Sequence, residues 1–342
     1  MHRCLELAHN GAGHVAPNPL VGAVLVQGDR ILAEGWHAEF GGPHAEVNCL
    51  RSFGDQQIPS DAVLYVNLEP CAHHGKTPPC VDLLICRGVK NLVVGCSDPN
   101  PTTHDKGIAR AREAGIEVIT DVLRDDCRWL NRRFITSFEK QRPYIILKWA
   151  QSADGFLDDH GRTARISSPE TDVIVHRWRA EEQAILVGSR TVLNDDPALT
   201  VRHVEGQDPL RVVLDRKNVS PLNASVFNSD ASTLLFTEER RADVATDQVV
   251  LHASDDPIPS MLRELHRRNI RSLLVEGGAE LLGHFISKGL WDEVRVITGS
   301  ATFITGTKAP VLHVHPARSI SSGSDRVDHY FEADPPPAVW SW

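Results

Sequence analysis

The chain has 342 residues, of which 41% are hydrophobic and 24% charged, a composition typical of globular proteins and not of disordered or fibrous ones. At roughly 150 residues per domain, this length predicts two domains. Lysine and arginine number 36 against 45 acidic residues, for a formal charge of −9, and no run of basic residues offers a surface for a phosphate backbone. We therefore expect no nucleic-acid partner.

The N-terminus and the cysteines indicate a compartment. The first residues, Met1 to Glu6, lack the apolar core of a signal peptide, and no stretch approaches the roughly 18 apolar residues that span a bilayer. We therefore expect a cytoplasmic protein with no membrane partner. The seven cysteines all precede residue 128. Because their number is odd and the expected compartment is reducing, metal binding or catalysis is a better use for them than disulfides.

Strand and helix patterns alternate in the first part of the chain, which predicts a sheet with helices on its faces. The expected strands are residues 20–26, 31–36, 62–68, 91–96 and 116–120, and the expected helices are residues 45–53, 81–87, 107–114 and 125–138. The polar segment Glu139 to Pro143 then ends in a proline, which cannot continue a helix. We place a domain boundary there, between residues 142 and 143.

The second part, residues 143–342, repeats the α/β pattern. The expected strands are residues 144–150, 184–188, 211–215, 233–236, 272–275 and 294–297, with a helix over residues 171–180. Two glycines, Gly277 and Gly278, follow the strand 272–275 and precede a helical pattern, so their backbone N–H groups would suit an anion. A tight turn explains the two glycines equally well. The proline-rich tail from Asp334 to Pro337 is expected to be extended.

Three residues of the first part form a candidate metal site. His44 opens one expected helix, and Cys71 and Cys80 lie between a strand and the next helix. Strand-to-helix junctions lie at one edge of an α/β sheet, so one imidazole and two thiolates can bind a zinc ion and leave a fourth position for water. Glu46, two residues after the histidine, is placed to move protons, as in the H-x-E…P-C signature of zinc nucleobase deaminases.

A structural zinc site is the alternative, because His73 or His74 could add a fourth protein ligand. The nearby Glu46 favours catalysis instead. For the other five cysteines we expect the ordinary role of a small buried hydrophobe; they are Cys4, Cys49, Cys86, Cys96 and Cys127.

Four motifs carry a family resemblance. They are Pro17 to Pro19 with Val21-Gly22, Pro43 to Val47, Leu68 to Cys80, and Asp98 to Pro101. In this order they closely resemble the deaminase half of the bifunctional deaminase/reductases of riboflavin biosynthesis, for which a long spacing between the two cysteines is typical. The resemblance implies a cytidine-deaminase-like fold for residues 1–142, zinc on His44, Cys71 and Cys80, and Glu46 as the proton shuttle. It also implies substrate contacts by Asn18, His73 or Lys76.

The second part resembles the reductase half of the same family, which is similar in fold to dihydrofolate reductase. The matching segments are Lys148, Ser152 to Gly155, Arg179-Ala180, Ala184 to Gly188, Thr191 to Leu193, Asp195 to Arg202 and Val275 to Gly278. The resemblance implies NADPH as cofactor, bound by Gln151, Thr191, Asp195, Gly278, Ala279, Glu280 and Leu281. It implies a substrate site formed by Thr163, Arg179, Leu199, Arg202 and Glu276, with Lys148 nearby.

Three departures from the family occur in this half. A Ser-Gln-Trp-Ile-Thr-like segment is replaced by Thr163 to Ser167, the serine after the strand 211–215 is replaced by Arg216, and an Ala-Pro segment is replaced by Thr298 to Ala301. Because arginine pairs well with phosphate, we expect Arg165 or Arg216 to contact a cofactor phosphate.

The leading hypothesis is a bifunctional enzyme of riboflavin biosynthesis. Its first domain would remove the 2-amino group of a diaminopyrimidine ribosylamine phosphate by hydrolysis, and its second would use NADPH to reduce the ribosyl group to ribityl. One alternative keeps the deaminase but makes the second domain a degenerate reductase that serves in binding or assembly. Another treats the cysteines as a structural zinc module without turnover. Sheet edges leave room for association, and we expect a homo-oligomer.

Overall fold

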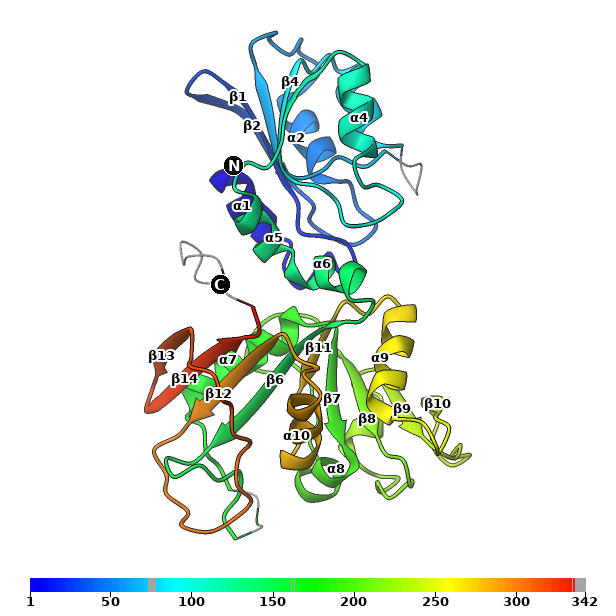
Figure 1. The fold of residues 1–342 in the computed structure, drawn as a ribbon, viewed down its shortest axis with the longest axis vertical. Helices are drawn as coiled ribbons and strands as arrows, with labels where there is room; N and C mark the ends of the chain where they lie inside the picture. Colours follow the sequence, from blue (N-terminus) through cyan, green and yellow to red (C-terminus); the bar gives the residue numbers. More distant parts are fainter. Residues whose placement is uncertain (73–77, 161, 163, 334, 336–342) are drawn as a thin grey trace. The chain divides into compact units, whose positions relative to one another are not determined.

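Figure 1 presents a computed structural model of the chain, which describes residues 1–72, 78–160, 162, 164–333 and 335. Three predicted site residues, His73, Lys76 and Thr163, lie outside the described residues. The chain divides into two compact units, residues 1–141 and residues 142–335. Among the residues that the structure describes, no helix has the length and apolar character needed to cross a bilayer.

The first unit contains a five-stranded sheet in the order β2-β1-β3-β4-β5. Strand β1 (Gly22–Gln27) is antiparallel to both of its neighbours, β2 (Arg30–Trp36) and β3 (Val63–Leu68). β3, β4 (Asn91–Cys96) and β5 (Glu117–Ile119) are parallel to one another. β2 and β3 therefore run in the same direction. The segments that follow them leave the same edge of the sheet, which confirms the arrangement predicted for the two strand-to-helix junctions.

Helices cover both faces of this sheet because successive strand residues point to opposite sides. Leu25, Leu64 and Leu92 face α2 (Ala45–Phe53), α3 (Cys80–Cys86) and α4 (Lys106–Glu113) in one apolar cluster. On the other face, Val24 packs against Cys4 and Leu7 of α1. The helices of that face are α1 (His2–His9), α5 (Arg124–Leu130) and α6 (Arg132–Glu139).

The prediction of a single helix over residues 125–138 is wrong, since the structure has α5 and α6 with a break at Asn131. The side chain of Asn131 is almost fully buried and binds the backbone of Leu20 twice. Its Oδ1 accepts the Leu20 N–H at 2.8 Å, and its Nδ2 donates to the Leu20 carbonyl at 2.9 Å. An asparagine that binds backbone groups in this way competes with helix continuation, so the chain turns at this position.

The second unit contains a nine-stranded sheet in the order β10-β9-β8-β7-β11-β6-β12-β14-β13. The first seven of these strands are parallel, and β14 and β13 complete the sheet as an antiparallel hairpin. The strands are β6 (Tyr144–Gln151), β7 (Ala184–Gly188), β8 (Leu210–Leu214), β9 (Thr233–Thr237), β10 (Asp247–Val250), β11 (Ser272–Val275), β12 (Glu293–Thr298), β13 (Arg318–Ser322) and β14 (Asp325–Phe331). The strand order reverses around β7, β11 and β6, and ligands of open α/β sheets bind at the carboxyl ends of strands at such a point.

The core of the second unit lies on both faces of this sheet. Ile145, Leu147 and Trp149 of β6 pack on one face with α9 (Pro257–Arg267) and α10 (Ala279–Ser287). Tyr144 and Ile146 pack on the other face with α7 (Pro169–Glu181). A further helix, α8 (Ser189–Asp195), begins directly where β7 ends. A short 3₁₀ helix spans Ser225–Phe227.

All six strands predicted for this unit are present, and both units are α/β as expected. No local pattern predicted α8, α9, β10 or the hairpin β13–β14. β13 is a polar edge strand with a single partly buried apolar residue, Ile320. Its place is fixed by pairing with β14 across the turn at Gly323, which has a φ of 56°, and hydrophobic alternation cannot reveal such pairing.

Candidate functional site

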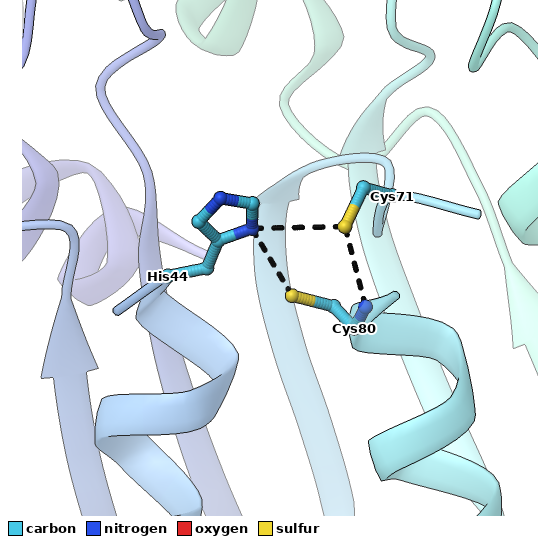
Figure 2. A group of neighbouring side chains, drawn as sticks. All are labelled: His44, Cys71 and Cys80. Atoms are coloured by element: carbon cyan, nitrogen blue, oxygen red, sulfur yellow. Dashed lines mark hydrogen bonds between the residues drawn. The ribbon is translucent and has the colours of Figure 1, made fainter. Parts of the chain in front are cut away.

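The three predicted metal ligands converge at the edge of the first unit's sheet. His44 is the residue before α2, Cys71 follows β3, and Cys80 is the first residue of α3. The Nδ1 atom of His44 lies 3.2 Å from Cys80 Sγ and 3.6 Å from Cys71 Sγ, and Figure 2 shows the three side chains pointing toward one another. In a tetrahedral zinc site the nitrogen and sulfur ligands are roughly 3.6 Å apart. Both the donor set and its spacing therefore fit zinc.

The surroundings of these ligands favour a thiolate. Hydrogen bonds from the Cys80 thiol and from His44 lower the pKa of Cys71 to about 4, against the effect of burial. The backbone N–H of Cys80, at the start of α3, also donates to Cys71 Sγ at 3.2 Å. The neighbouring Cys71 sulfur and burial raise the pKa of Cys80. Two sulfurs that share one proton near an imidazole are ready to exchange that proton for a divalent cation.

Glu46 lies in the first turn of α2 with only 3% of its surface exposed. Burial, with the negative charge of Cys71 as the next cause, raises the pKa of this carboxyl to about 6. A carboxylate that titrates near neutral pH beside a metal site is suited to both accepting and donating a proton. The structure therefore places the predicted proton shuttle beside the metal ligands.

Two further side chains lie next to His44. The ring of His37 is buried and meets the ring of His44 edge-on, with centroids 5.5 Å apart. One ring nitrogen of His37 is 2.9 Å from the Pro43 carbonyl, and the other is 3.1 Å from the amide nitrogen of Asn18, a predicted substrate contact. His37 was not predicted as a site residue, because it stands alone in a loop without a motif around it.

A second group of possible metal ligands, Glu69, His104 and Asp105, lies near the same edge. The carboxylate of Glu69 is buried, and each of its oxygens accepts two backbone N–H groups at 2.9 to 3.2 Å. The donors are Asp98, Asp105, Gly107 and Ile108. Because these four bonds occupy the lone pairs of Glu69, this group is a structural clamp on the loop between β4 and α4 and not a metal site.

The other cysteines are mostly core residues, as predicted. Burial raises the pKa of Cys4, Cys49 and Cys96 to about 12, so these thiols stay neutral, and Cys127 is also fully buried. The prediction is wrong for Cys86, which is exposed at the last residue of α3. The apolar face of that helix is set by Val81 and Leu84, which leaves Cys86 on the opposite side.

A buried charged cluster lies at the carboxyl edge of the second sheet. Glu276, directly after β11, accepts two hydrogen bonds from Arg179 of α7 at 2.9 and 2.8 Å, and Lys148 Nζ of β6 lies 3.4 Å from the same carboxylate. Burial alone would raise the pKa of Glu276, but the charges of Arg179 and Lys148 hold it well below the ordinary value. Three predicted site residues are therefore brought together from three different elements.

The segment after α8 adds further predicted residues to this cluster. Leu199 is buried and has a φ of 56°, a left-handed conformation that is uncommon for leucine. The carbonyl of Thr200 accepts a hydrogen bond from Arg179 Nη1 at 3.3 Å, and the Thr200 hydroxyl accepts one from Arg202 Nη1 at 3.0 Å. The backbone N–H of Arg202 donates to His176 of α7, so the predicted substrate residues other than Thr163 lie along one connected path.

Predicted cofactor residues lie where β7 and β11 end, at the starts of α8 and α10 (Figure 1). Gly278 is the residue before α10, and a Cβ atom on it would lie 3.8 Å from Thr191 Oγ1 of α8. Ala279, Glu280 and Leu281 form the first turn of α10. Glu280 pairs with Arg190 at 2.8 Å, which links the two helix starts.

The remaining predicted cofactor residues are more scattered. Gln151, at the end of β6, accepts a hydrogen bond from the Trp149 indole at 2.9 Å. Arg165 pairs with Asp172 at 2.6 Å, and Arg216 pairs with Glu238. Asp195 is the exposed last residue of α8. The structure therefore holds both predicted phosphate-binding arginines in ion pairs within the second unit.

Two known families match the chain. Residues 1–96 match the family described as the cytidine and deoxycytidylate deaminase zinc-binding region, and residues 143–315 match the RibD C-terminal domain. The match to the first family includes the three clustered metal ligands and Glu46.

Full-length relatives match both units together. The chain is 41% identical to the riboflavin biosynthesis protein RibD of Aquifex aeolicus over 303 residues, which cover 86% of this chain and 85% of the relative. It is 37% identical to the Escherichia coli RibD over 315 residues, with 86% and 85% covered.

Solved structures agree with these matches. A diaminohydroxyphosphoribosylaminopyrimidine deaminase/5-amino-6-(5-phosphoribosylamino)uracil reductase from Thermotoga maritima aligns with a TM-score of 0.88 at 39% identity, over 96% of each chain. A RibD structure from Acinetobacter baumannii aligns with a TM-score of 0.87 at 32% identity, over 96% of this chain and 97% of the other.

Proposed function

The chain belongs to the RibD family of bifunctional riboflavin-biosynthesis deaminase/reductases, and we propose which of its residues carry each of the two reactions and on which substrate. Members of this family have a zinc-dependent deaminase in the first part of the chain and a reductase that uses NADPH in the second. The observation that carries the proposal is the triad of His44, Cys71 and Cys80 beside the buried Glu46, in a chain whose second unit matches the family reductase.

The proposed substrate of the first unit is 2,5-diamino-6-(5-phosphoribosylamino)pyrimidin-4(3H)-one. His44, Cys71 and Cys80 would hold the zinc ion, which supplies Lewis acidity and lowers the pKa of water. The carboxylate of Glu46 accepts a proton from the attacking water and later donates a proton to the departing amine. The product is 5-amino-6-(5-phosphoribosylamino)uracil together with ammonia.

Binding of this substrate rests on groups around the zinc edge. His37, whose two ring nitrogens are bonded to Pro43 and Asn18, holds the Asn18 amide beside His44, and the remaining amide oxygen and N–H of Asn18 match the polar edge of a pyrimidine. His73 and Lys76, which lie outside the described residues, complete the proposed set. Glu46 argues against a purely structural zinc site. Burying a carboxyl group is unfavourable, and a site without turnover has no use for this carboxyl.

The second unit is proposed to reduce the ribosyl group of the deaminated product. NADPH supplies the hydride. Glu276 fixes Arg179 and Lys148 at the carboxyl edge of the sheet, and Lys148 is placed to donate a proton to the sugar oxygen as the chain opens. Arg202 donates through a single nitrogen to Thr200 among the described contacts, so its other N–H groups suit the substrate phosphate. Leu199 and Thr163 complete the proposed substrate site.

Cofactor binding is proposed at the starts of α8 and α10. Thr191, Gly278, Ala279, Glu280 and Leu281 lie there, and the nine-residue α10 offers backbone N–H groups to a phosphate. Gln151 lies at the end of β6, three residues after Lys148, and would contact the nicotinamide end. Asp195 and one of Arg165 and Arg216 would contact the adenosine end, after exchange of an ion pair.

The degenerate-reductase alternative loses support from this geometry. None of the three departures, Thr163 to Ser167, Arg216 and Thr298 to Ala301, includes a member of the charged cluster of Lys148, Arg179 and Glu276, which is intact. An intact buried cluster of two cations and one carboxylate is costly unless it serves binding or catalysis.

Two further expectations concern the whole protein. A reducing compartment such as the cytoplasm keeps Cys71 and Cys80 from forming a disulfide, so we propose that the enzyme acts there. The strands β10 and β13 lie at the two edges of the described sheet, and an edge strand can pair with another chain. We therefore propose a homo-oligomer, to be tested by light scattering of the purified protein.

Mass spectrometry of the products tests both reactions in one experiment. The purified protein is incubated with the diaminopyrimidine ribosylamine phosphate, with and without NADPH. Deamination exchanges an amine for oxygen and adds roughly one dalton, and reduction adds two hydrogens only when NADPH is present. The first shift alone would support the degenerate-reductase alternative. Neither shift, from protein that holds zinc, would support a structural zinc module.

A further inference from the structure

Two segments that leave the carboxyl ends of β6 and β12 pair with each other beyond the sheet. Residues 152–160 follow β6 and residues 299–309 follow β12. Backbone hydrogen bonds join Ala153 to Ala301 at 2.7 Å, Leu157 to Thr307 at 2.8 Å, and Ala309 to Gly155 at 2.9 Å. Figure 1 shows the two segments, green and orange, extending together past the ends of these strands. We call this paired structure the clasp.

Asp154 holds the tip of the clasp. Its carboxylate accepts the backbone N–H groups of Phe303 at 3.1 Å and of Ile304 at 2.8 Å, together with the Ser152 hydroxyl at 2.6 Å. Ile304 has a φ of 69°, a left-handed conformation that is unfavourable for a β-branched residue. The hydrogen bond from its N–H to Asp154 helps to hold it in that conformation. Strained backbone of this kind is concentrated at ligand clamps and active sites.

Gly299 leaves space for a third segment, residues 164–167, at the base of the clasp. We call this space the seat. A Cβ atom on this glycine would lie 2.3 Å from the backbone oxygen of Ile166, closer than real contacts allow. The φ of Gly299 is outside the left-handed range, so the glycine is needed for space and not for its backbone conformation. Residues 164–167, which lead into α7, can therefore approach the end of β12 only because residue 299 lacks a side chain.

This seat is continuous with the proposed reductase site. The N–H of Gly299 donates to the carbonyl of Gln151 at 2.9 Å, and Gln151 lies three residues after Lys148 on β6. The seated segment contains Arg165 and continues into α7, which supplies Arg179 to Glu276. The chain departs from its family both at Thr163 to Ser167 and at Thr298 to Ala301. The close approach of Gly299 to Ile166 brings these two segments together in space.

We propose that Gly299 and Asp154 are positioning residues of the reductase, which hold residues 164–167 at the ends of β6 and β12, beside the proposed substrate site. This inference rests on the proposed reductase function. Neither side chain touches the reacting atoms; Gly299 leaves the space, and Asp154 holds the clasp that carries it. Displacing the segment weakens substrate binding. The rate of hydride transfer, which depends on groups at the ends of β6 and β11, stays largely unchanged.

The test uses Gly299→Ala in the full-length protein, with Ser300→Ala as the matched control at the exposed neighbouring position. The added methyl group must displace the Ile166 backbone. We expect the KM for the deaminated sugar phosphate to rise about tenfold, which corresponds to roughly 1.4 kcal/mol, with kcat within a factor of about two. The deaminase rate, measured on the same molecules, stays unchanged. Hydrogen exchange in residues 164–167 becomes faster, whereas exchange in β8 does not.

Asp154→Asn is the second variant. Because the Asp154 side chain is exposed, this substitution disturbs folding less than a substitution at a buried position. Asparagine keeps one acceptor and loses the other, so exchange at Phe303 and Ile304 becomes faster and KM rises in the same direction. Asp247→Asn, on the far edge strand β10, is its control. If Gly299→Ala unfolds the second unit, Asp154→Asn decides the question.

The outcomes separate this inference from the proposed function. Wild-type KM values in both variants, with a reductase that works, would overturn the positioning role and leave the function standing. If kcat and thermal stability both fall while KM does not change, the role of these residues is merely structural. That result would also overturn the positioning role. A wild-type chain that deaminates but does not reduce would overturn the reductase proposal, and this inference with it.

Discussion

Replacing Glu69 by glutamine is the substitution with the clearest structural consequence in the first unit. The two carboxylate oxygens of Glu69 accept four backbone N–H groups from the loop between β4 and α4. A glutamine side chain has one acceptor oxygen and one NH₂ group. Two of the four N–H groups would then lose their acceptor and face another donor.

The magnitude follows from that count. Each buried N–H group left without an acceptor costs roughly 1–3 kcal/mol, so two of them cost roughly 2–6 kcal/mol. A domain is stable by only about 5–15 kcal/mol, and the loss would be a large part of that. The loop also carries Asp98, whose pKa burial raises to about 6 and which interacts electrostatically with Cys71, so we expect the deaminase to become slower as well.

Hydrogen exchange measured by mass spectrometry checks this prediction residue range by residue range. In Glu69→Gln the amides of residues 98–108 should exchange faster, by an amount that reports a loss of opening free energy of roughly 2–6 kcal/mol. Glu113→Gln, an exposed position on α4, should change the opening free energy by less than about 0.5 kcal/mol. Unchanged exchange in Glu69→Gln would refute the argument. A fall from two zinc ions per chain to one would instead assign Glu69, His104 and Asp105 to a second metal site.

Four other predictions concern the two sites. Glu46→Gln should slow deamination by roughly 10²–10⁴-fold and leave reduction of pre-formed deaminated product unchanged by mass spectrometry. Because the pKa of Glu46 is about 6 and the ionised form accepts the proton, the deaminase kcat/KM should fall about tenfold per pH unit below that value; a flat pH profile down to pH 4 would contradict this. Cys80→Ser should reduce bound zinc, measured by atomic absorption, from one ion per chain to nearly none, with reductase activity retained. Glu276→Gln leaves Arg179 and Lys148 without their shared carboxylate and should destabilise the second unit by roughly 3–5 kcal/mol. The loss would be seen as thermal inactivation of the reductase at a lower temperature. The control Glu280→Gln loses only an exposed pair with Arg190 and should destabilise the unit by less than about 1 kcal/mol.

Much of this protein can be predicted from local sequence. Buried parallel strands read as short apolar runs bounded by turn residues, and for this reason the six predicted strands of the second unit match the structure closely. The metal ligands were predictable because each stands at a strand-to-helix junction with a residue type that binds zinc. Glu46 was predictable from its position two residues after His44.

The elements that were missed carry weaker local signals. β13 is polar and defined by its partner strand, and the break at Asn131 depends on Leu20, 111 positions earlier in the chain. His37 and Glu69 act through contacts with loops, and neither stands in a periodic pattern that indicates its partners. The exposure of Cys86 depends on which side of α3 faces the core.

The sequence by itself determined the residue types, the strands and helices that they form, and the chemistry of the zinc ligands, because these depend on neighbours along the chain. The tertiary structure decided which of those residues meet. Arg179 and Glu276 are 97 positions apart, and Asp154 and Ile304 are 150 apart. Such contacts depend on the order and register of the strands, which pairing across the whole sheet fixes and no local pattern encodes.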